Sequence, residues 1–341
     1  MSNKKALIIG GAGFIGRNLT DYLIDNFDYE ITLIDNFLSS NQFMVRVDSK
    51  ITLIEGDAGN LELYKNLQTD FDEVYLLHCL HGNQSSIYDP ISDLNNTLKP
   101  TIVVFEWLRQ THSKASIVYA GAGCAVAEKT WDQPTGVEET DVINLNHDSP
   151  YSISKLTGEM HAQFYSKQFN LNIKRARFQN VYGPGEYLGA GVWRGTEATI
   201  WRNVTPSFIW QALNNEKLVV TGQTAARDFI FVRDLVRGLH LVANRGSLGN
   251  AYNLASGTET NIFTWAQLII DILKSESIIE VRAARDWDNS GRRFGNTAKS
   301  KKELGFEIST NVTHGLIQTI KWIELHKATM KDLIENHSNY L

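Results

Sequence analysis

The 341-residue chain has few cysteines, no long apolar run and no excess of positive charge, and each absence excludes a class of protein. The two cysteines, Cys79 and Cys124, cannot build a disulfide framework, so we expect free thiols and a reducing compartment, the cytoplasm. No stretch reaches the roughly 18 unbroken apolar residues of a transmembrane helix, and the first residues contain no signal-peptide core. With 33 basic against 38 acidic side chains and no basic stripe, nucleic acid is not an expected partner.

The first half of the chain alternates short β-rich runs with longer amphipathic segments. A chain of this length suggests about two domains. Strands separated by helices predict βαβ units, and therefore a parallel sheet with helices on both faces. The expected strands are Ala6–Ile9, Ile31–Asp35, Ile51–Glu55, Val74–Leu77, Ile117–Ala120 and Lys174–Phe178, and the expected helices are Gly13–Asn26, Leu61–Thr69, Ile91–Gln110 and Pro150–Phe169.

This alternation of strands and helices ends near residue 180. We therefore predict a doubly wound α/β domain over residues 1–178, followed by a smaller substrate-binding lobe and a C-terminal tail over 179–341. A segment near 228–255 is expected to return to the sheet. Within the lobe, the sequence predicts a helix over Arg202–Leu213, a strand over Leu218–Thr221 and a helical tail over 328–341.

A glycine-rich loop follows the first expected strand. Gly10 permits a tight turn, Gly13 lets a pyrophosphate approach the backbone, and Gly16 lets the next helix pack on the strand. That helix offers free N–H groups and its positive dipole end to an anion. Asp35 ends the next strand about 20 residues later, where an acid hydrogen-bonds the adenosine ribose and repels a 2′-phosphate. A glycine triplet alone also fits a plain tight turn, but in this context it predicts a Rossmann-type domain that binds NAD rather than NADP. Further expected cofactor contacts are Phe14, Ile15, Asn36, Asp57, Ala58, Leu80 and Phe178.

Two candidate catalytic side chains follow Pro150, a residue that often begins a helix. Tyr151 and Lys155 are four residues apart, which puts them on one helix face. A phenol with a pKa of about 10 is a poor base at neutral pH. A neighbouring ammonium and a cationic nicotinamide both lower that pKa. Tyr151 could then take a hydroxyl proton while hydride leaves the same carbon for the cofactor. The spacing alone is common on surface helices, but after a dinucleotide-binding fold it predicts a redox site.

Together these segments resemble the extended short-chain dehydrogenase/reductases, and within them the nucleotide-sugar epimerases and dehydratases. The resemblance covers nearly the whole chain. In particular, two segments after residue 188 are similar to epimerases encoded in bacterial surface-polysaccharide (O-antigen) gene clusters. Besides the glycine loop and the Tyr151/Lys155 pair, the segments that carry the resemblance to the family are Asp35–Ser40, Gly56–Asp57, His78, Arg177–Pro184, Gly189–Thr196, Trp201–Pro206, Arg227–Phe229 and Lys302–Phe306.

The resemblance implies a set of substrate contacts after residue 179. Asparagine side chains would hold the diphosphate and base of a sugar nucleotide. One arginine would bind the diphosphate, and a second would come from later in the chain, because a guanidinium fork matches phosphate oxygens. Surface ion pairs and a helix cap would explain the same residues. Trp193, Arg194 and Trp201 fit either a sugar pocket or the core of the lobe. The implied contacts are Asn180, Asn203 and Val204 for the diphosphate and base, Arg227 for the diphosphate, and Arg285 or Arg292 as the second arginine.

The sequence departs from the family pattern after the fifth expected strand. The family has Ser or Thr there, bonded to the sugar oxygen that becomes a carbonyl, whereas this chain has Ala122, or Gly123 if the alignment shifts by one. Losing one preorganised donor costs about 10²–10³ in rate, unless a backbone N–H or a water replaces it.

The next position separates the relatives by reaction. Dehydratases have an Asp-Glu pair directly after the hydroxyl, decarboxylating relatives have Glu at the second position, and 3,5-epimerising relatives have Cys, as at Cys124 here. Cys124 is thus a candidate acid/base or a small buried apolar side chain. The lysine or histidine that those epimerases pair with the cysteine is absent near Asn203.

We therefore expect an NAD-dependent nucleotide-sugar epimerase that oxidises a sugar hydroxyl and returns the hydride after inversion, with Tyr151, Lys155 and Cys124 as catalytic residues. A dehydratase or other redox-initiated lyase is one alternative. A catalytically impaired protein that binds NAD or a sugar nucleotide is another. The resemblance also implies a homodimer that pairs the helices around 92–110 and 151–168 in a four-helix bundle. The apolar side chains Val104, Phe105 and Leu108 would suit that interface, or the core of the protein.

Overall fold

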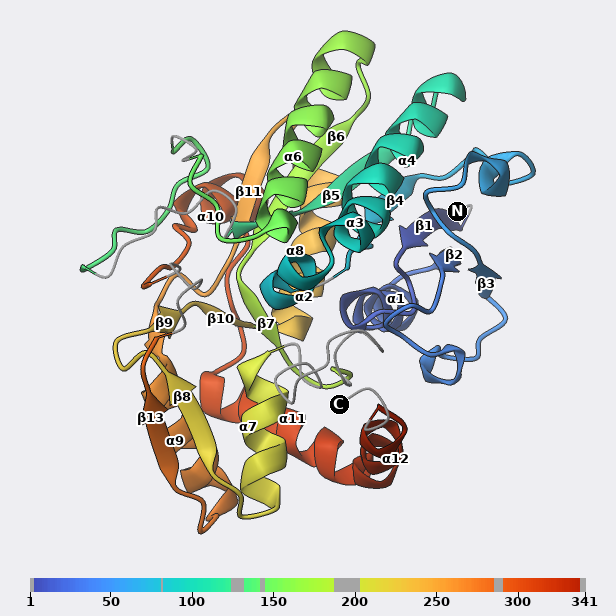
Figure 1. Ribbon diagram of the computed structural model, residues 1–341. Helices are drawn as coiled ribbons and strands as arrows, with labels where there is room; N and C mark the ends of the chain where they lie inside the picture. Colours follow the sequence, from blue (N-terminus) through green and yellow to red (C-terminus); the bar gives the residue numbers. More distant parts are fainter. Residues whose placement is uncertain are drawn as a thin grey trace.

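A seven-stranded parallel sheet forms the centre of the protein (Figure 1). The computed structural model describes residues 3–80, 82–123, 132–141, 145–186, 203–284 and 291–337. The sheet order is β3-β2-β1-β4-β5-β6-β11. The chain adds β2 and β3 on one side of β1 and then crosses back to add β4, β5 and β6 on the other side, so the strand order reverses between β1 and β4. All six expected strands are present, and the Rossmann-type α/β fold is confirmed. The strands are β1 (Lys4–Ile9), β2 (Tyr29–Asp35), β3 (Ile51–Glu55), β4 (Glu73–Leu76), β5 (Ser116–Ala122), β6 (Ile173–Phe178) and β11 (Ala251–Leu254).

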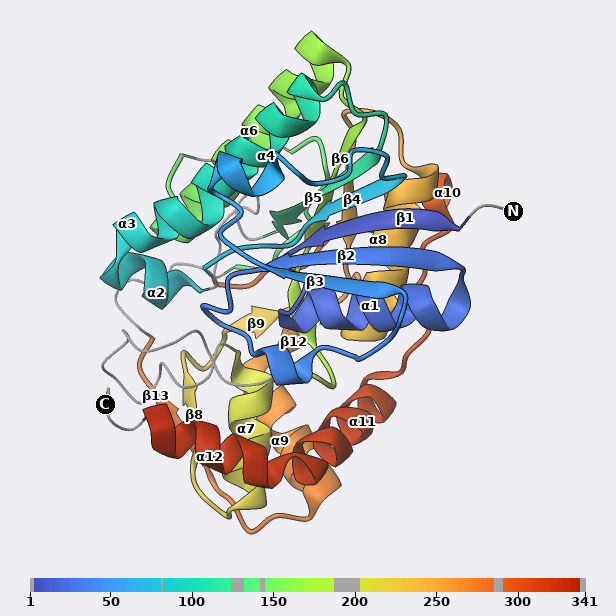
Figure 2. The same cartoon turned by 90° about the vertical axis from the view of Figure 1, so that its right-hand side faces the viewer.

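Helices cover both faces of this sheet (Figure 2). α1 (Phe14–Asn26) and α8 (Val232–Arg245) lie on one face, and α4 (Lys99–Gln110) and α6 (Pro150–Phe169) lie on the other. The apolar residues of α8 recur with helical spacing, which gives the helix one buried stripe. Its fully buried members are Val232, Leu235, Val236, Leu239 and Val242. The chain thus returns to the sheet through α8, and β11 then pairs with β6.

The expected helix over Ile91–Gln110 consists of three segments. α3 (Pro90–Asp93) is followed by η3 (Leu94–Leu98), one turn of π-helix, and then by α4. Pro100 lies in the first turn of α4 and has no N–H, so it cannot continue the regular helical hydrogen bonding of the preceding turn. A π-turn absorbs that interruption without ending the helical path.

Val104, Phe105 and Leu108 belong to the core and not to an exposed face. Their exposed fractions are 0%, 0% and 1%, and they pack against the sheet together with residues of β4 and β5. The interpretation of these three side chains as interface residues is therefore wrong.

The segment expected as a helix over Leu61–Thr69 forms only η2 (Leu61–Tyr64), a short 3₁₀ turn. Tyr64 is the one buried residue of this turn, and its hydroxyl donates to the Ala58 carbonyl at 2.9 Å. A single buried side chain does not supply the tertiary packing that sustains most helices of this length.

A second core gathers side chains from several elements after residue 179, whereas α8 and β11 pack in the core of the central sheet. Trp265 is fully buried at its centre and stacks on Phe229 with ring centroids 3.9 Å apart. The expected helical tail is observed as far as residue 337, and the division of the chain at residue 178 stays a prediction. The remaining elements are η1 (Gln42–Met44), α2 (Asn83–Tyr88), β7 (Asn180–Tyr182), α7 (Val204–Leu213), β8 (Leu218–Thr221), β9 (Ala226–Arg227), β10 (Phe229–Phe231), β12 (Thr260–Asn261), α9 (Ile262–Leu273), β13 (Ile279–Arg282), α10 (Ala298–Leu304), α11 (Val312–Leu325) and α12 (Lys327–His337). Among the described residues, no helix is both long and apolar enough to cross a bilayer.

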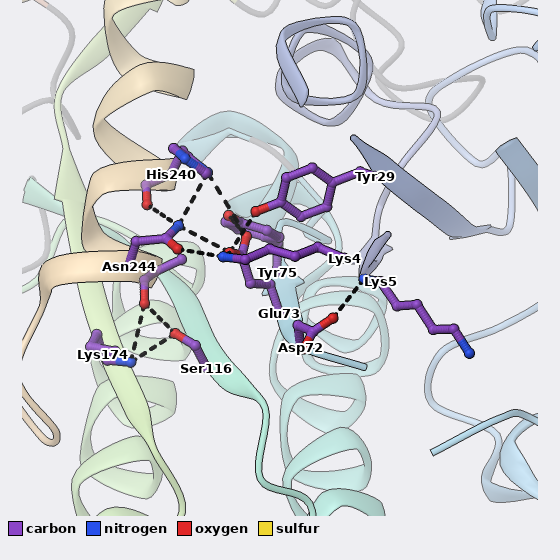
Figure 3. A network of polar contacts seen from close by, with 11 residues as sticks. Lys4, Lys5, Tyr29, Asp72, Glu73, Tyr75, Ser116, Lys174, His240 and Asn244 are labelled. Atoms are coloured by element: carbon purple, nitrogen blue, oxygen red, sulfur yellow. Dashed lines mark hydrogen bonds and ion pairs between the residues drawn. The ribbon is translucent and has the colours of Figure 1, made fainter. Parts of the chain in front are cut away.

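A buried carboxylate closes the amino edge of the sheet (Figure 3). Glu73 accepts hydrogen bonds from the hydroxyls of Tyr29 at 2.7 Å and Tyr75 at 2.6 Å. Lys4 and Asn244 donate to the same carboxylate at 3.3 and 3.0 Å. Burial and the Glu73 charge both raise the pKa of Tyr29, so its hydroxyl stays a donor. The network joins β1, β2 and β4 to the last turn of α8, at the edge opposite the cavity described next.

Candidate active site

A cavity of about 980 Å³ lies at the carboxyl edge of the central sheet. Open α/β sheets bind ligands at this edge, where the strand order reverses. Its walls come from the loops after β1 to β5, from α6, and from α7 and β8 of the second core. It brings together most of the residues predicted from the sequence, namely Gly10, Gly13, Phe14, Ile15, Gly16, Asp35, Asn36, Asp57, Ala58, Tyr151, Lys155, Phe178, Asn180, Asn203, Val204 and Arg227.

The glycine loop has the close contacts that only glycine permits. Gly10 has a φ of +81°, and a Cβ atom there would lie 2.7 Å from the His78 backbone nitrogen. A Cβ on Gly16 would overlap the Gly10 carbonyl oxygen and lie 2.7 Å from that of Gly11. Gly13 is the N-cap of α1 and supplies no side-chain cap, so the first N–H groups of the helix point toward the cavity edge. This cradle fits a pyrophosphate.

Replacing Gly16 with alanine is expected to weaken NAD binding by roughly 10²-fold, the order of effect of a displacement of about 1 Å in a positioned site. The added methyl must push the backbone of Gly10 and Gly11 away from α1. Isothermal titration with NAD+ measures the change. Asn26→Ala, at the exposed end of the same helix, is the matched control and should bind NAD+ normally. Equal affinity of Gly16→Ala and the natural protein would contradict the role assigned to the loop.

Asp35 is held in place at the end of β2 by three hydrogen bonds. Its Oδ2 accepts from the Ala12 N–H at 2.9 Å, and its Oδ1 accepts from the Phe37 N–H and the Ser40 hydroxyl, both at 2.9 Å. The carboxylate therefore braces the glycine loop and lines the cavity beside Asn36. A fixed negative charge there suits a ribose diol and repels a 2′-phosphate.

The adenine side of the cavity is formed by the loop after β3. Asp57 and Ala58 line it, and the Asp57 carboxylate accepts from the Gly59 N–H at 2.7 Å. Leu80, in contrast, lies outside the cavity lining. Its side chain is fully buried, and its N–H donates to the Thr97 hydroxyl at 3.0 Å, which ties this loop to η3. Leu80 thus supports the wall from behind and does not face the cavity.

Tyr151 and Lys155 lie in the first turns of α6 and both line the cavity. Ser149 caps this helix by accepting from the Ser152 N–H at 3.3 Å, and Pro150 occupies its first turn. The Lys155 ammonium donates to the Ala120 carbonyl at 2.9 Å and is 3% exposed. The helix thereby fixes a buried positive charge one turn from a phenol that is 8% exposed.

His78 contributes a neutral imidazole to the same wall. Its Nε2 lies 3.1 Å from the Thr101 hydroxyl, and its buried Nδ1 has no hydrogen-bond partner in the described part of the chain. Burial and the nearby Lys155 charge lower the pKa of His78 to about 3. The ring is therefore uncharged at neutral pH and does not compete with Lys155.

The end of β5 provides no polar side chain. Ala122 lines the cavity, and Gly123 follows it. A Cβ on Gly123 would overlap Nε2 of Gln179 and lie 2.5 Å from its Cδ. Gln179, the single residue between β6 and β7, also lines the cavity and was not among the predicted site residues. Cys124, the next position in the chain, lies outside the described residues.

Asn203 and Arg227 face the cavity from the second core. The Asn203 amide donates to the Glu186 carboxylate at 2.5 Å. The Arg227 guanidinium donates to the carbonyl oxygens of Ala226 at 2.9 Å and Gly291 at 2.7 Å. Neighbouring Asp228 accepts three backbone N–H bonds, and its burial raises its pKa. These bonds fix the short strand that presents Arg227.

Of the two positions predicted for a second arginine, Arg285 and Arg292, the structure describes Arg292. Arg292 forms an ion pair with Glu259 and lies outside the cavity lining. Its neighbour Arg293 lines the cavity, is 7% exposed, and has an Nε without a hydrogen-bond partner in the part of the chain that the structure covers. The sequence shows two adjacent arginines, Arg292 and Arg293, and the fold is needed to tell which of them lines the cavity. Arg285, Trp193, Arg194 and Trp201 lie outside the described residues.

The helix behind the glycine loop also contacts the second half of the cavity. Arg17 Nη2 donates to the Gly185 carbonyl at 2.5 Å, and the Asn18 amide donates to the Pro184 carbonyl at 3.0 Å. Both carbonyls belong to the turn after β7, which precedes cavity residue Glu186. α1 therefore holds the dinucleotide cradle and this turn in one arrangement.

A glycine cradle at a helix N-terminus, an acid after the second strand and a buried Tyr–Lys pair beside them define a dinucleotide-dependent redox enzyme of the Rossmann type. The model of the NAD dependent epimerase/dehydratase family matches residues 6–255. The chain belongs to this family of NAD-dependent nucleotide-sugar epimerases and dehydratases.

Comparison with individual proteins agrees with this assignment. The Bordetella bronchiseptica enzyme WbmF, solved in complex with NAD+ and UDP, is 40% identical, with a TM-score of 0.88 over 100% of this chain and 98% of that one. The epimerase Mth375 of Methanothermobacter thermautotrophicus is 30% identical, with a TM-score of 0.88 over 97% and 95% of the two chains. UDP-glucuronic acid decarboxylase 1 of Danio rerio is 27% identical over 94% of this chain and 72% of its own length.

Proposed function

We propose that this protein is an NAD-dependent nucleotide-sugar epimerase that works through a transient keto sugar. The observation that carries the proposal is the shared cavity, in which Tyr151 and Lys155 face the same space as the glycine cradle and Asp35. The likeness to O-antigen-cluster epimerases supports a role in making precursors of bacterial surface polysaccharide. The two cysteines of the chain are consistent with a reducing, cytoplasmic setting.

Bound NAD+ supplies a hydride acceptor and, once reduced, a hydride donor to the same sugar carbon. Tyr151 takes the proton of the sugar hydroxyl as that carbon becomes a carbonyl, and returns it when the hydroxyl is restored. Lys155, held by the Ala120 carbonyl, stabilises the phenolate form of Tyr151, which is present before the proton is taken and again after it is returned. Asn203, Arg227 and Arg293 also line the cavity, and would bind the diphosphate. Binding at this distant group leaves the sugar free to present either face after oxidation.

Epimerisation is favoured over water elimination by the chain after β5. Elimination needs an acid and a base beside the ketone, which the related dehydratases supply as an Asp-Glu pair. This chain has Gly123-Cys124 at that point. Epimerisation requires neither carboxylate, because it only transfers a hydride to NAD+ and a proton to Tyr151 and then returns both to the sugar.

The test is a panel of UDP-, dTDP-, GDP- and CDP-linked hexoses. The first readout is the thermal shift of the protein with each compound, and the second is transient NADH absorbance with every compound that binds. Mass spectrometry of the product then separates the reactions, because epimerisation leaves the mass unchanged and dehydration removes one water. A product lighter by one water would replace the epimerase proposal with a lyase, and binding without any NADH signal would favour a non-catalytic protein.

We further propose that the protein is a homodimer. α6 carries an exposed apolar stripe at helical spacing, formed by Ile153, Met160 and Phe164, which are 51–52% exposed. The neighbouring α2 and α3 segment extends it with exposed Ile87, Tyr88, Ile91 and Leu94. An apolar face of this extent marks an interaction site. A second copy is the occupant that would cover it symmetrically, through α6 and its neighbours.

Phe164→Glu is therefore expected to convert a dimer into a monomer, because a charge would be buried without a partner in the interface. Light scattering coupled to gel filtration at micromolar concentration measures the mass. Leu325→Glu, which changes an apolar residue that is 80% exposed on α11, is the control and should remain dimeric. A monomeric natural protein at that concentration would refute the dimer.

A further inference from the structure

Contacts between α6 and β5 locate the part of the cavity wall that lies nearest to Tyr151 and Lys155. The Glu159 carboxylate, one turn farther along α6, lies directly against Gly121 of β5. Moving one helical turn toward the cavity, about 6 Å, leads from Glu159 to Lys155. Ala122, the last residue of β5, is one position past Gly121, and Gly123 follows it. Ala120 and Ala122 at the end of β5 line the cavity together with Tyr151 and Lys155, and the Lys155 ammonium donates to the Ala120 carbonyl.

The neighbouring strand brings Gln179 to the same level. Phe178 pairs with Ala122 in the β5–β6 register, so Gln179 follows directly beside Gly123. Arg177, two residues earlier, points toward α6, where it binds Glu159 at 2.7 Å. Gln179 follows the last residue of β6 and lines the same cavity as Tyr151 and Lys155. Its carboxamide occupies the space where a Cβ on Gly123 would be.

Two glycines leave this space open for the carboxamide. Gly123 would overlap it if it had a side chain, and a Cβ on Gly295 would lie 3.5 Å from the Gln179 Nε2. Within the described residues, Gln179 makes no side-chain hydrogen bond to the protein. Of the other amides that line the cavity, Asn203 donates to Glu186 and Asn83 accepts from the Ser149 hydroxyl at 3.0 Å. Beside Ala122 and Gly123, which have no polar side chain, the Gln179 carboxamide is thus a polar group of the cavity wall that no other described side chain engages.

We propose that the Gln179 carboxamide is a catalytic residue, which hydrogen-bonds the sugar oxygen that changes between hydroxyl and carbonyl. The inference rests on the proposed epimerase function and assigns a role that Ala122 and Gly123 cannot perform. The amide N–H donates to the oxygen as it gains carbonyl character. At the start and end of the cycle the same N–H donates to the hydroxyl oxygen, whose own proton is directed to Tyr151.

A donor fixed in place before the reaction stabilises charge without reorganising, and removing one costs about 10²–10³ in rate. Gln179→Ala is therefore expected to lower kcat by about 10²-fold, with KM changed much less, because nucleotide and diphosphate are bound elsewhere in the cavity. The peak of transient NADH should fall as well, because the keto sugar loses a hydrogen-bond donor. Gln267→Ala, on the exposed face of α9, is the matched control and should keep natural kinetics.

The reciprocal change gives a sharper test. Gly123→Ser alone places its side chain against Gln179, so it should be strongly impaired. Gly123 does not have the positive φ that disfavours a side chain, and Gln179→Ala removes the atoms that would be overlapped. The double variant Gln179→Ala/Gly123→Ser should therefore recover at least about tenfold in kcat over Gln179→Ala, because a hydroxyl replaces the amide as donor.

The assays use the NAD-loaded enzyme and the panel compound that gives product, with UDP binding and thermal unfolding measured for each variant. A fall in kcat that serine restores supports the proposal. If the natural enzyme turns over and Gln179→Ala retains kcat within about twofold, or if serine restores nothing to a folded double variant that still binds UDP, the role of Gln179 is refuted while the epimerase proposal stands. If the natural protein gives neither NADH nor product with any panel compound, the epimerase proposal falls, and this inference falls with it.

Discussion

Replacing Tyr151 with phenylalanine is expected to lower kcat by about 10²–10⁴-fold, the usual contribution of a positioned proton-transfer group. The substitution removes one oxygen atom from a side chain that is 8% exposed and keeps the ring that packs there. Lys155 remains bonded to the Ala120 carbonyl, so the cavity wall and the buried charge are retained. The loss should therefore fall on chemistry, and NAD+ and the nucleotide sugar should bind with near-natural affinity.

The decisive measurement is the NADH absorbance of the loaded enzyme after mixing with a turned-over nucleotide sugar. In Tyr151→Phe the absorbance should stay flat on the time scale at which the natural enzyme reaches its peak. Tyr22→Phe on α1, outside the cavity lining, is the matched control and should give the natural trace. An unchanged NADH trace in Tyr151→Phe would mean that another group accepts the proton and that the Tyr–Lys mechanism is incorrect.

Glu159→Ala is expected to cost about 3–5 kcal/mol of folding free energy, as the loss of one partner from a buried ion pair generally does. The Glu159 carboxylate accepts from Arg177 Nε at 3.0 Å and Nη2 at 2.7 Å, and the two side chains are 2% and 4% exposed. Without the carboxylate, the guanidinium would keep a buried charge whose remaining partner among the described residues is the Glu139 carbonyl, 3.0 Å from Nη1. Gly121 at the cavity edge would also lose the group packed against it.

Urea unfolding followed by circular dichroism measures this cost. Glu307→Ala removes the carboxylate of the exposed pair with Lys301, which are 61% and 68% exposed, and should leave the unfolding midpoint almost unchanged. Glu159→Leu/Arg177→Met should recover much of the loss, because the buried Arg177 charge is removed with its partner, while Arg175, 18% exposed, keeps its bond to the Gly249 carbonyl. Equal midpoints for Glu159→Ala and the natural protein would show that water reaches the Arg177 guanidinium.

The parts of the site formed by one local segment could be predicted from the sequence. The spacing of Gly10, Gly13 and Gly16 predicts the turn, the close approach and the helix start. The four-residue separation of Tyr151 and Lys155 predicts a common helix face. Strand and helix propensities add the order of elements, which is sufficient for the parallel sheet. In each case the physical cause lies within about 20 residues, which is the range that a sequence pattern covers.

Contacts set by strand register could not be predicted in this way. Gln179 lies beside Gly123 only because Phe178 pairs with Ala122, a contact between residues 56 apart in the chain. Arg292 and Arg293 are chemically identical, and an ion pair with Glu259 decides which of them faces the cavity. The apolar residues of α4 fit an interface or a core equally well until the sheet beneath them is in place. Tertiary pairing, not local propensity, determines each of these.

The hydrogen bonds from Arg17 and Asn18 to the turn at Pro184 and Gly185 constrain how this enzyme can diversify. Because α1 receives the dinucleotide at one end and anchors this turn along its side, a tilt of the helix displaces both compartments together. Selection for a new sugar is therefore limited by a helix that binds no sugar. Change is less restricted on α7 and β8, which approach the cavity from the opposite side.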